Sequence, residues 1–160
     1  MFVSVAISGL LYFQFLPEAV TSGGVPCWVS GTGFGGELGY ELFCKPENAE
    51  DLWSVVIDRC AARPFGVEAI EVLRIESGLI VTDYDYHAHE RSPFDFSFDK
   101  LVAFAGANFN GEAALRQIAP NPPRRFKTLL LETEELPEYG APVTSEGEAA
   151  GTLTSPTKSP

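Results

Sequence analysis

Three glycines in the stretch GTGFGG, namely Gly31, Gly33 and Gly36, have the G-x-G-x-x-G spacing of a loop that binds a dinucleotide pyrophosphate. Such a loop needs a strand before it and a helix after it, because the helix N-terminus meets the phosphates. Here a strand-like segment, ELGYELFC (residues 37–44), follows the glycines. The context therefore favours a glycine-rich connection between two strands, in which glycine supplies a positive φ.

Two carboxylates follow this loop, Glu37 and Glu41. In a strand they would share one face, because side chains alternate with a period of two. A carboxylate there could accept two parallel hydrogen bonds from an N–H and an adjacent amino group, which is the edge that a pterin or a guanine offers. The alternative is that both glutamates are solvated, and the spacing alone favours that alternative.

An arginine, Arg74, lies in the segment LRIES beside Ile70 and Leu73, which belong to the apolar face of a predicted helix. We therefore expect Arg74 near the core. An arginine in that position pairs with a carboxylate, which belongs either to the protein or to a ligand. The sequence leaves both alternatives open.

The segment DYDYHAHE (residues 83–90) alternates Asp83, Asp85, His87 and His89 with other residues. In an extended chain these four side chains would share a face and could form a divalent-metal patch. Pro93 and the polar surroundings favour an exposed loop instead, so we predict no metal site. Both histidines lie in this one loop, and no Ser-His-Asp or Cys-His arrangement is supported.

Composition limits the classes of function. The 160 residues are 45% hydrophobic and carry a formal net charge of -11, which predicts a folded domain and disfavours nucleic acid or an anionic membrane surface as partner. Cys27, Cys44 and Cys60 are odd in number and widely spaced. This argues against a disulfide framework or a zinc site and indicates buried free thiols in a reducing, cytoplasmic compartment.

The elements that would position these residues alternate between strands and helices. The apolar N-terminus, residues 1–17, lacks the basic start of a signal peptide and predicts one or two buried strands. Further strands are predicted at residues 25–30, 37–44 and 124–133, short strands between turns at 138–156, and helices at 45–61, 67–78 and 110–119. In the helix at 67–78, Val67, Ile70 and Leu73 are expected to face inward. The pattern predicts an α+β fold with a domain boundary near residue 121.

Four motifs in order resemble the glycine-cleavage T-protein (aminomethyltransferase) family. TGFGGELGYELF resembles its signature T-G-[YF]-[TS]-G-E-x-G-[FY]-E, and PFGVEAIEVLRIESGLIVTDYDY resembles its G-x-x-A-x-x-x-L-R-x-E-x-G-L segment. ANFNGEAALRQI is similar to the family's F-x-G-x-x-A-L helix, and GTLTSPTKSP to the start of its C-terminal β-barrel. Together these motifs extend over residues 25–160.

The resemblance implies a tetrahydrofolate-binding protein of one-carbon transfer, with small-molecule folate and a methyl or aminomethyl donor as partners. It implies that Glu41 holds the pterin edge, Phe34 lines the pocket, and Arg74 contacts the folate or steadies the site. The implied fold is the ferredoxin-like half of the T-protein folate-binding fold in residues 1–120, with the first strands of a truncated C-terminal β-barrel in residues 121–160.

The departures from the family pattern shape the remaining expectations. Thr82 stands where the family has a tyrosine, so SGLIVTDYDY is more similar to the folate-dependent demethylases and to the folate domains of dimethylglycine and sarcosine dehydrogenases. The family's N-terminal catalytic aspartate has no counterpart in residues 1–24. We therefore expect a fragment without catalytic residues and inactive by itself. A non-catalytic folate-binding protein and a homodimer through surfaces exposed by truncation stay open.

Overall fold

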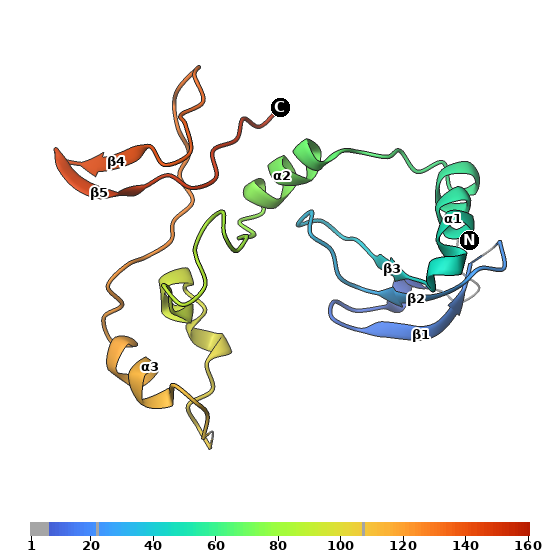
Figure 1. Cartoon of the computed structure of the whole chain (residues 1–160), viewed down its shortest axis with the longest axis horizontal. Coiled ribbons are helices and arrows are strands. Elements are labelled where there is room, and N and C mark those ends of the chain that lie inside the picture. The colour runs from blue at the N-terminus through green and yellow to red at the C-terminus, as the bar shows by residue number, and fades with distance from the viewer. Residues whose placement is uncertain (1–6, 22, 107) are drawn as a thin grey trace. The chain divides into compact units, whose positions relative to one another are not determined.

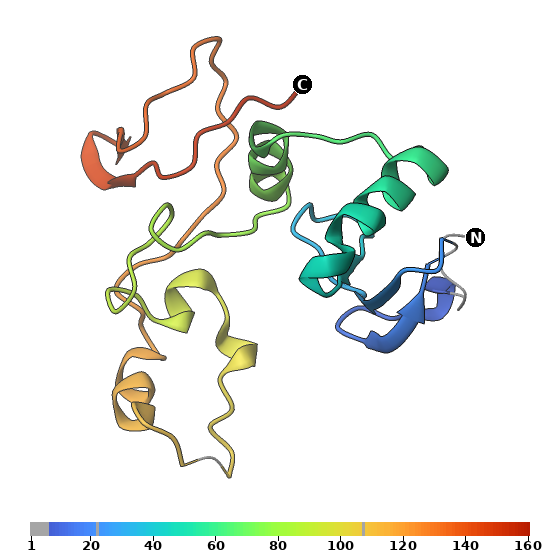
Figure 2. The same ribbon diagram turned by 45° about the vertical axis from the view of Figure 1, so that its right-hand side comes forward.

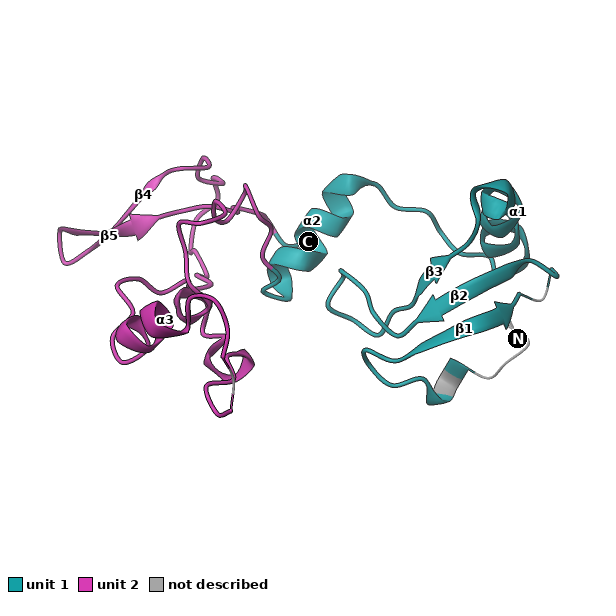
Figure 3. Ribbon diagram, turned by 60° about the horizontal axis from the view of Figure 1, so that its bottom comes forward, with its two compact units in different colours: residues 1–79, 159–160 teal, residues 80–158 magenta. Residues whose placement is uncertain are grey.

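The computed structural model describes residues 7–21, 23–106 and 108–160. Within them the chain forms a mixed α+β structure with three α-helices and two small antiparallel sheets, which confirms the predicted class (Figure 1). Residues 1–79 with 159–160 make one compact unit and residues 80–158 another (Figure 3). The predicted domain boundary near residue 121 falls inside the second unit and stays a prediction.

The first unit is built on a three-stranded sheet in the order β1-β2-β3. The strands are β1 (Phe15–Val20), β2 (Pro26–Ser30) and β3 (Glu41–Phe43). The strand expected at 25–30 is confirmed. The strand expected at 37–44 is shorter than predicted, because residues 37–40 do not pair. The buried strands expected in residues 1–17 are wrong for the described part, because a 3₁₀ turn (Ile7–Gly9) and an exposed loop precede β1, which begins at Phe15 and is largely exposed. Residues 1–6 lie outside the described residues.

A helical segment follows β3 and covers the inner side of the sheet. It comprises a 3₁₀ turn Pro46–Asn48, the helix α1 (Ala49–Ser54) and a π-helical turn Val55–Arg59, so the predicted helix is confirmed. Leu52 and Val55 are buried and pack with Val25 and with partly buried Leu42. Figure 2 shows α1 lying beside this sheet. In a second buried cluster, Ala19 on β1 packs with Cys27 and Val29 on β2.

The helix α2 (Val67–Glu76) also belongs to the first unit and confirms the helix predicted at 67–78. Its buried residue is Arg74, and Ile70 and Leu73 are partly buried. The expectation that Val67 faces inward is wrong, since this side chain is 75% exposed. Val67 is the first residue of the helix, and the preceding residues 61–66 are all exposed, so no described neighbour covers it.

The second unit contains little regular structure. Its elements are the helix α3 (Glu112–Ile118) and a hairpin of β4 (Pro142–Ser145) and β5 (Glu148–Thr152). Glu146 and Gly147, between the strands, both have positive φ, as in a two-residue type I′ turn. The helix and the short strands confirm the prediction. The strand expected at 124–133 is wrong, because no described strand pairs with that segment.

Aromatic side chains replace a sheet as the core of the second unit. Phe94 is 2% exposed, and Phe96 packs against Tyr86 and Phe126 at ring-centroid distances of 4.8 and 5.7 Å. Two 3₁₀ turns, Pro93–Phe96 and Asp99–Leu101, carry some of these rings. The backbone N–H of Ser92 donates to Oδ2 of Asp95 at 2.7 Å, which fixes the start of the first turn.

Candidate functional site

The outer face of the sheet in the first unit gathers aromatic side chains around Glu41. Trp28 is paired with Phe43, and Ser30 with Glu41, across β2 and β3. Phe15 on β1 is paired with Ser30. Because alternate residues of a strand point to the same side, these side chains share the face opposite to buried Cys27 and Val29. We call Phe15, Trp28 and Phe43 the aromatic platform.

The aromatic platform is open to solvent. Phe15, Trp28 and Phe43 are 60%, 57% and 54% exposed, and the rings of Phe15 and Trp28 are stacked with centroids 6.3 Å apart. A hollow of about 190 Å³ lies over the platform and reaches Ser30, the pairing partner of Glu41. Exposed aromatic faces of this kind mark binding sites, since solvated rings gain from stacking against another flat surface.

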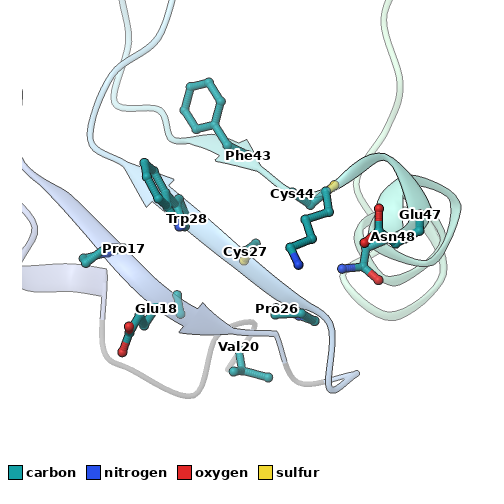
Figure 4. A pocket seen from close by; sticks show the side chains of 12 residues that line it. Pro17, Glu18, Val20, Pro26, Cys27, Trp28, Phe43, Cys44, Glu47 and Asn48 are labelled. Atoms are coloured by element: carbon teal, nitrogen blue, oxygen red, sulfur yellow. The ribbon is translucent and has the colours of Figure 1, made fainter.

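A larger cavity of about 590 Å³ adjoins the hollow and shares Trp28 and Phe43 with it (Figure 4). It lies toward the end of β3, where Cys44 and Lys45 follow the strand. Glu18 and Glu47 also line it. The outer face therefore offers apolar rings in its middle and charged groups near its end.

Glu41 is exposed and is oriented by a hydroxyl from the glycine-rich loop. The Oγ1 of Thr32 donates a hydrogen bond to Oε2 of Glu41 and lies 2.9 Å from the Oγ of Ser30. Since a hydroxyl has one proton, Ser30 donates to Thr32 when Thr32 donates to the carboxylate. The other carboxylate oxygen, Oε1, makes no hydrogen bond with the described residues. Glu41 is thus held in place and still has acceptor capacity for a ligand.

The loop of Gly31, Gly33 and Gly36 leads from β2 to β3, so a strand and not a helix follows it. Gly36 has a φ of +78°, and a Cβ there would lie 2.1 Å from the Cβ of Ser77, so glycine is required. A Cβ at Gly31 would lie 2.6 Å from the carbonyl oxygen of Leu11. The predicted connecting role is confirmed, and the need for a positive φ holds for Gly36.

Phe34 lies in the same loop and is 43% exposed. The loop packs near the end of α2, because Gly35 faces Leu73 and Gly36 faces Ser77. The loop thereby contacts Glu41 through Thr32 and the end of α2 through Gly36. Phe34 lies in the loop that leads into β3, the strand that begins with Glu41.

Arg74 is 2% exposed, which confirms its expected place near the core. Its Nε and Nη2 donate to Oε2 of Glu71 at 2.9 and 2.6 Å, and its Nη1 donates to the carbonyl oxygen of Leu79 at 3.3 Å. The guanidinium therefore has protein partners that hold α2 to the segment after it. The sequence left open whether Arg74 pairs with a carboxylate of the protein or of a ligand. In the structure its partner is a carboxylate of the protein, Glu71.

The shared face predicted for Glu37 and Glu41 is wrong. Glu37 is exposed and lies before β3 begins, in the part of the segment that does not pair with β2. The period-two rule applies only within a regular strand. Gly35, Gly36 and Gly39 surround Glu37, and glycine weakens strand formation.

The loop at residues 83–90 belongs to the second unit and is not extended. Asp83 and His89 both have positive φ. Asp85 is 5% exposed and accepts hydrogen bonds from the N–H of Val81 at 2.8 Å and from the hydroxyls of Thr154 and Ser155 at 2.8 and 2.5 Å. The expectation of an exposed loop is therefore wrong at Asp85, which fastens the loop to residues 154–155.

The other acidic residues and both histidines of this loop are exposed. Oδ1 of Asp83 and Nδ1 of His87 lie 3.5 Å apart, with side chains 79% and 62% exposed. In the part of the chain that the structure describes, no group of three or more His, Cys, Asp or Glu side chains is placed to hold a metal ion. None of the described helices is long and apolar enough to cross a membrane.

The three cysteines are free thiols with different surroundings. Cys27 is buried, Cys44 is half-buried and Cys60 is exposed, so the prediction that all three are buried is wrong for Cys60. Burial raises the pKa of the Cys27 thiol above its ordinary value, and the nearby Cys44 raises it further. Cys27 is therefore protonated at neutral pH.

Residues 4–106 match the family model described as the GCVT N-terminal domain. The chain belongs to this family. An aminomethyltransferase of Streptomyces avermitilis is 36% identical over 96% of this chain and 43% of its own length. A probable aminomethyltransferase of Halobacterium salinarum is 34% identical over 89% of this chain and 40% of its own length. A trimethylamine-oxide aldolase of Ruegeria pomeroyi is 34% identical over 93% of this chain and 20% of its own length.

These comparisons confirm the resemblance to the aminomethyltransferase family. The chain spans less than half the length of each of these relatives. Sequence reasoning did not find the aromatic platform, although Phe43 was visible as the apolar exception on the polar side of its strand. It also did not find Thr32, whose contact with Glu41 depends on the fold of the glycine-rich loop.

Proposed function

We propose that this GCVT-family chain binds a reduced folate as part of a tetrahydrofolate-dependent, aminomethyltransferase-like one-carbon transferase. The observation that carries this proposal is the position of Glu41, whose oriented carboxylate shares a sheet face with the aromatic platform. Domains of this family bind tetrahydrofolate, which agrees with that arrangement.

The residues of the outer face fit the chemistry of a pterin. A pterin is flat and carries an N–H beside an amino group, so it can donate two parallel hydrogen bonds to one carboxylate. Glu41 would accept those bonds, and the aromatic platform would receive the flat ring by stacking. When bound, the reduced folate supplies the ring nitrogen that accepts the one-carbon unit, while the chain's own residues orient that ring.

Two further residues have proposed roles. Phe34 would line the pocket from the glycine-rich loop, where its ring is partly exposed. Arg74 would steady the site by holding α2, against whose end the loop packs, through its bonds to Glu71 and Leu79. A direct contact between Arg74 and the folate would require the guanidinium to exchange one of these partners.

The finer description of the fold is part of the same proposal. Residues 1–120 would form part of the folate-binding α+β domain, with packing like one half of a ferredoxin-like fold. Residues 121–160 would form the first strands of a C-terminal β-barrel, to which the β4–β5 hairpin would belong. A separate structure of residues 121–160 within a longer chain would test that assignment.

A second candidate concerns the donor of the one-carbon unit. The relative from Ruegeria pomeroyi is a trimethylamine-oxide aldolase, which supports a methylated amine as donor in place of an aminomethyl group. The candidate is a folate domain of the demethylase or dimethylglycine/sarcosine dehydrogenase type. Formation of methylene-folate from dimethylglycine in the presence of an added electron acceptor, but not from an aminomethyl carrier, would favour this candidate in the protein that contains the chain.

The test of folate binding is a calorimetric titration of 5-formyltetrahydrofolate into the wild-type chain and into Glu41→Gln. Removing a charged hydrogen-bond acceptor costs about 1.5–3 kcal/mol, so we expect the affinity to fall by about 10- to 150-fold. Glu37→Gln is the matched control, because Glu37 is exposed and lies outside the strand. It should bind like wild type.

The two parts of the proposal fail separately in this experiment. A wild-type chain that does not bind the reduced folate would overturn the proposed function. Equal affinities of wild type and Glu41→Gln would leave folate binding in place and reject Glu41 as the residue that recognises the pterin.

A further inference from the structure

Two of the three thiols lie next to each other at one end of the sheet. The antiparallel register of β2 and β3 pairs Val29 with Leu42 and Trp28 with Phe43. Continuing this register by one residue pairs Cys27 with Cys44. Residues opposed in this way have Cα atoms about 4.5 or 5.5 Å apart. Both separations fall within the range of about 4.4–6.8 Å that a disulfide can span.

Both thiols belong to the same side of the sheet. Cys27 and Val29 are the buried residues of β2, whereas Trp28 between them is exposed. Alternation along β3 places Cys44 on the side of Leu42 and away from Phe43. In agreement with this, Cys44 and Leu42 pack against the buried cluster that contains Cys27. The two cysteines are therefore cross-strand neighbours on one face.

The pair has unequal access to solvent. Cys27 is 4% exposed, whereas Cys44 is half-buried. Both line the cavity of about 590 Å³, and Figure 4 shows Cys27 on β2 and Cys44 just after β3. A small oxidant in the solvent would thus reach the half-buried Cys44 more readily than the buried Cys27.

We propose that Cys27 and Cys44 are a reversible oxidation site, at which a peroxide converts the two thiols into a disulfide. Hydrogen peroxide first oxidises the Cys44 sulfur to a sulfenic acid, and one water leaves. The Cys27 sulfur then attacks the sulfenic sulfur, the S–S bond forms, and the hydroxyl departs with the Cys27 proton as a second water. One peroxide is reduced by two electrons, and a small dithiol reverses the reaction.

Burial assigns Cys27 to the second step, because the neighbouring Cys44 sulfur reaches it more readily than a solvent oxidant does. Its pKa is raised by burial and by Cys44, so its thiolate is scarce at neutral pH. A buried, protonated thiol is a poor first target for peroxide. It serves as the resolving partner once the neighbouring sulfur has been oxidised. The bond would tie the end of β3, the strand that begins with Glu41, covalently to β2.

The test is peptide mapping of the purified chain after peroxide treatment and alkylation without reductant. Cleavage after glutamate separates the three cysteines, because Cys27 falls in residues 19–37, Cys44 in 42–47 and Cys60 in 51–68. We expect a cross-linked peptide of 19–37 with 42–47 that lacks two hydrogen atoms. The number of alkylated cysteines should fall from three to one, and reduction should restore it.

Two variants make the result specific. Cys60→Ser, which removes the exposed thiol, should form the same cross-link. Cys27→Ser should leave Cys44 as a sulfenic acid that dimedone traps. A cross-link that instead involves Cys60, or an oxidised Cys44 in wild type while Cys27 stays fully alkylated, would overturn the proposal.

Discussion

Glu41 and Asp85 are carboxylates in two parts of the molecule, and their surroundings differ in almost every respect. Asp85 is 5% exposed and accepts hydrogen bonds from Val81, Thr154 and Ser155. Glu41 is exposed, is held by the hydroxyl of Thr32, and shares its sheet face with the aromatic platform. Asp85 is engaged by donors of its own chain, whereas Glu41 can still accept hydrogen bonds from a ligand.

This difference teaches how to separate structural from ligand-binding carboxylates. Residue type and spacing allowed a divalent-metal patch at residues 83–90, although the polar surroundings favoured an exposed loop. The structure shows that its central carboxylate instead joins segments that are 69 and 70 residues apart in sequence. A carboxylate whose oxygens are occupied by protein donors supports the fold, and its removal should affect stability before binding.

The largest effect is therefore expected for Asp85→Ala. Loss of the buried carboxylate removes the acceptor of three half-buried donors, on Val81, Thr154 and Ser155, which should lower the free energy of unfolding by about 3 kcal/mol. Urea unfolding of the chain measures this. Asp83→Asn is the control, since Asp83 is 79% exposed and asparagine tolerates its positive φ, and it should change stability by less than about 0.5 kcal/mol. If Asp85→Ala were as stable as wild type, Asp85 would not be a structural carboxylate, and its contrast with Glu41 would be wrong.

An intermediate effect is expected for Trp28→Leu, which removes the central ring of the aromatic platform. Because stacking of aromatic rings contributes about 0.5–1.5 kcal/mol, the affinity for the reduced folate should fall by up to about tenfold. Stability should change little, since Trp28 is 57% exposed. Trp53→Leu is the control, because Trp53 is 60% exposed on α1, away from the platform. Equal losses in both variants would contradict the stacking role.

The smallest effect is expected for Thr32→Val, which removes the hydroxyl that orients Glu41. Its loss should weaken folate binding by about 1 kcal/mol, or roughly fivefold. The measurement that sharpens the comparison is a double-mutant cycle with Glu41→Gln. If Thr32 acts through Glu41, its substitution should cost little once the carboxylate is gone. Additive losses would indicate that Thr32 acts independently of Glu41.

The sequence predicted the elements whose local pattern agrees with their packing. The short strand pattern at residues 25–30, the amphipathic period of residues 45–61 and the turns between short strands at 138–156 each specify their own element. The glycine-rich loop was also interpreted correctly, because the residues after it do not form a helix. In these elements the local sequence preference agrees with the structure that the fold requires.

The sequence could not predict features that depend on distant residues. Burial of Asp85 depends on residues 154–155, and the length of β3 depends on where pairing with β2 stops. The segment at 124–133 has strand-like composition but pairs with no described strand. For the site, the motif resemblance pointed to Glu41, Phe34 and Arg74. Whether these residues contact a folate stays a prediction.

The exposure of Trp28 gives the outer face an intrinsic optical probe. The chain has two tryptophans, and the other, Trp53, lies on α1. A flat ligand stacked on the aromatic platform would quench the emission of Trp28 and leave that of Trp53 as an internal reference. Tryptophan fluorescence of the wild-type chain could therefore follow occupancy of this face in real time without any label.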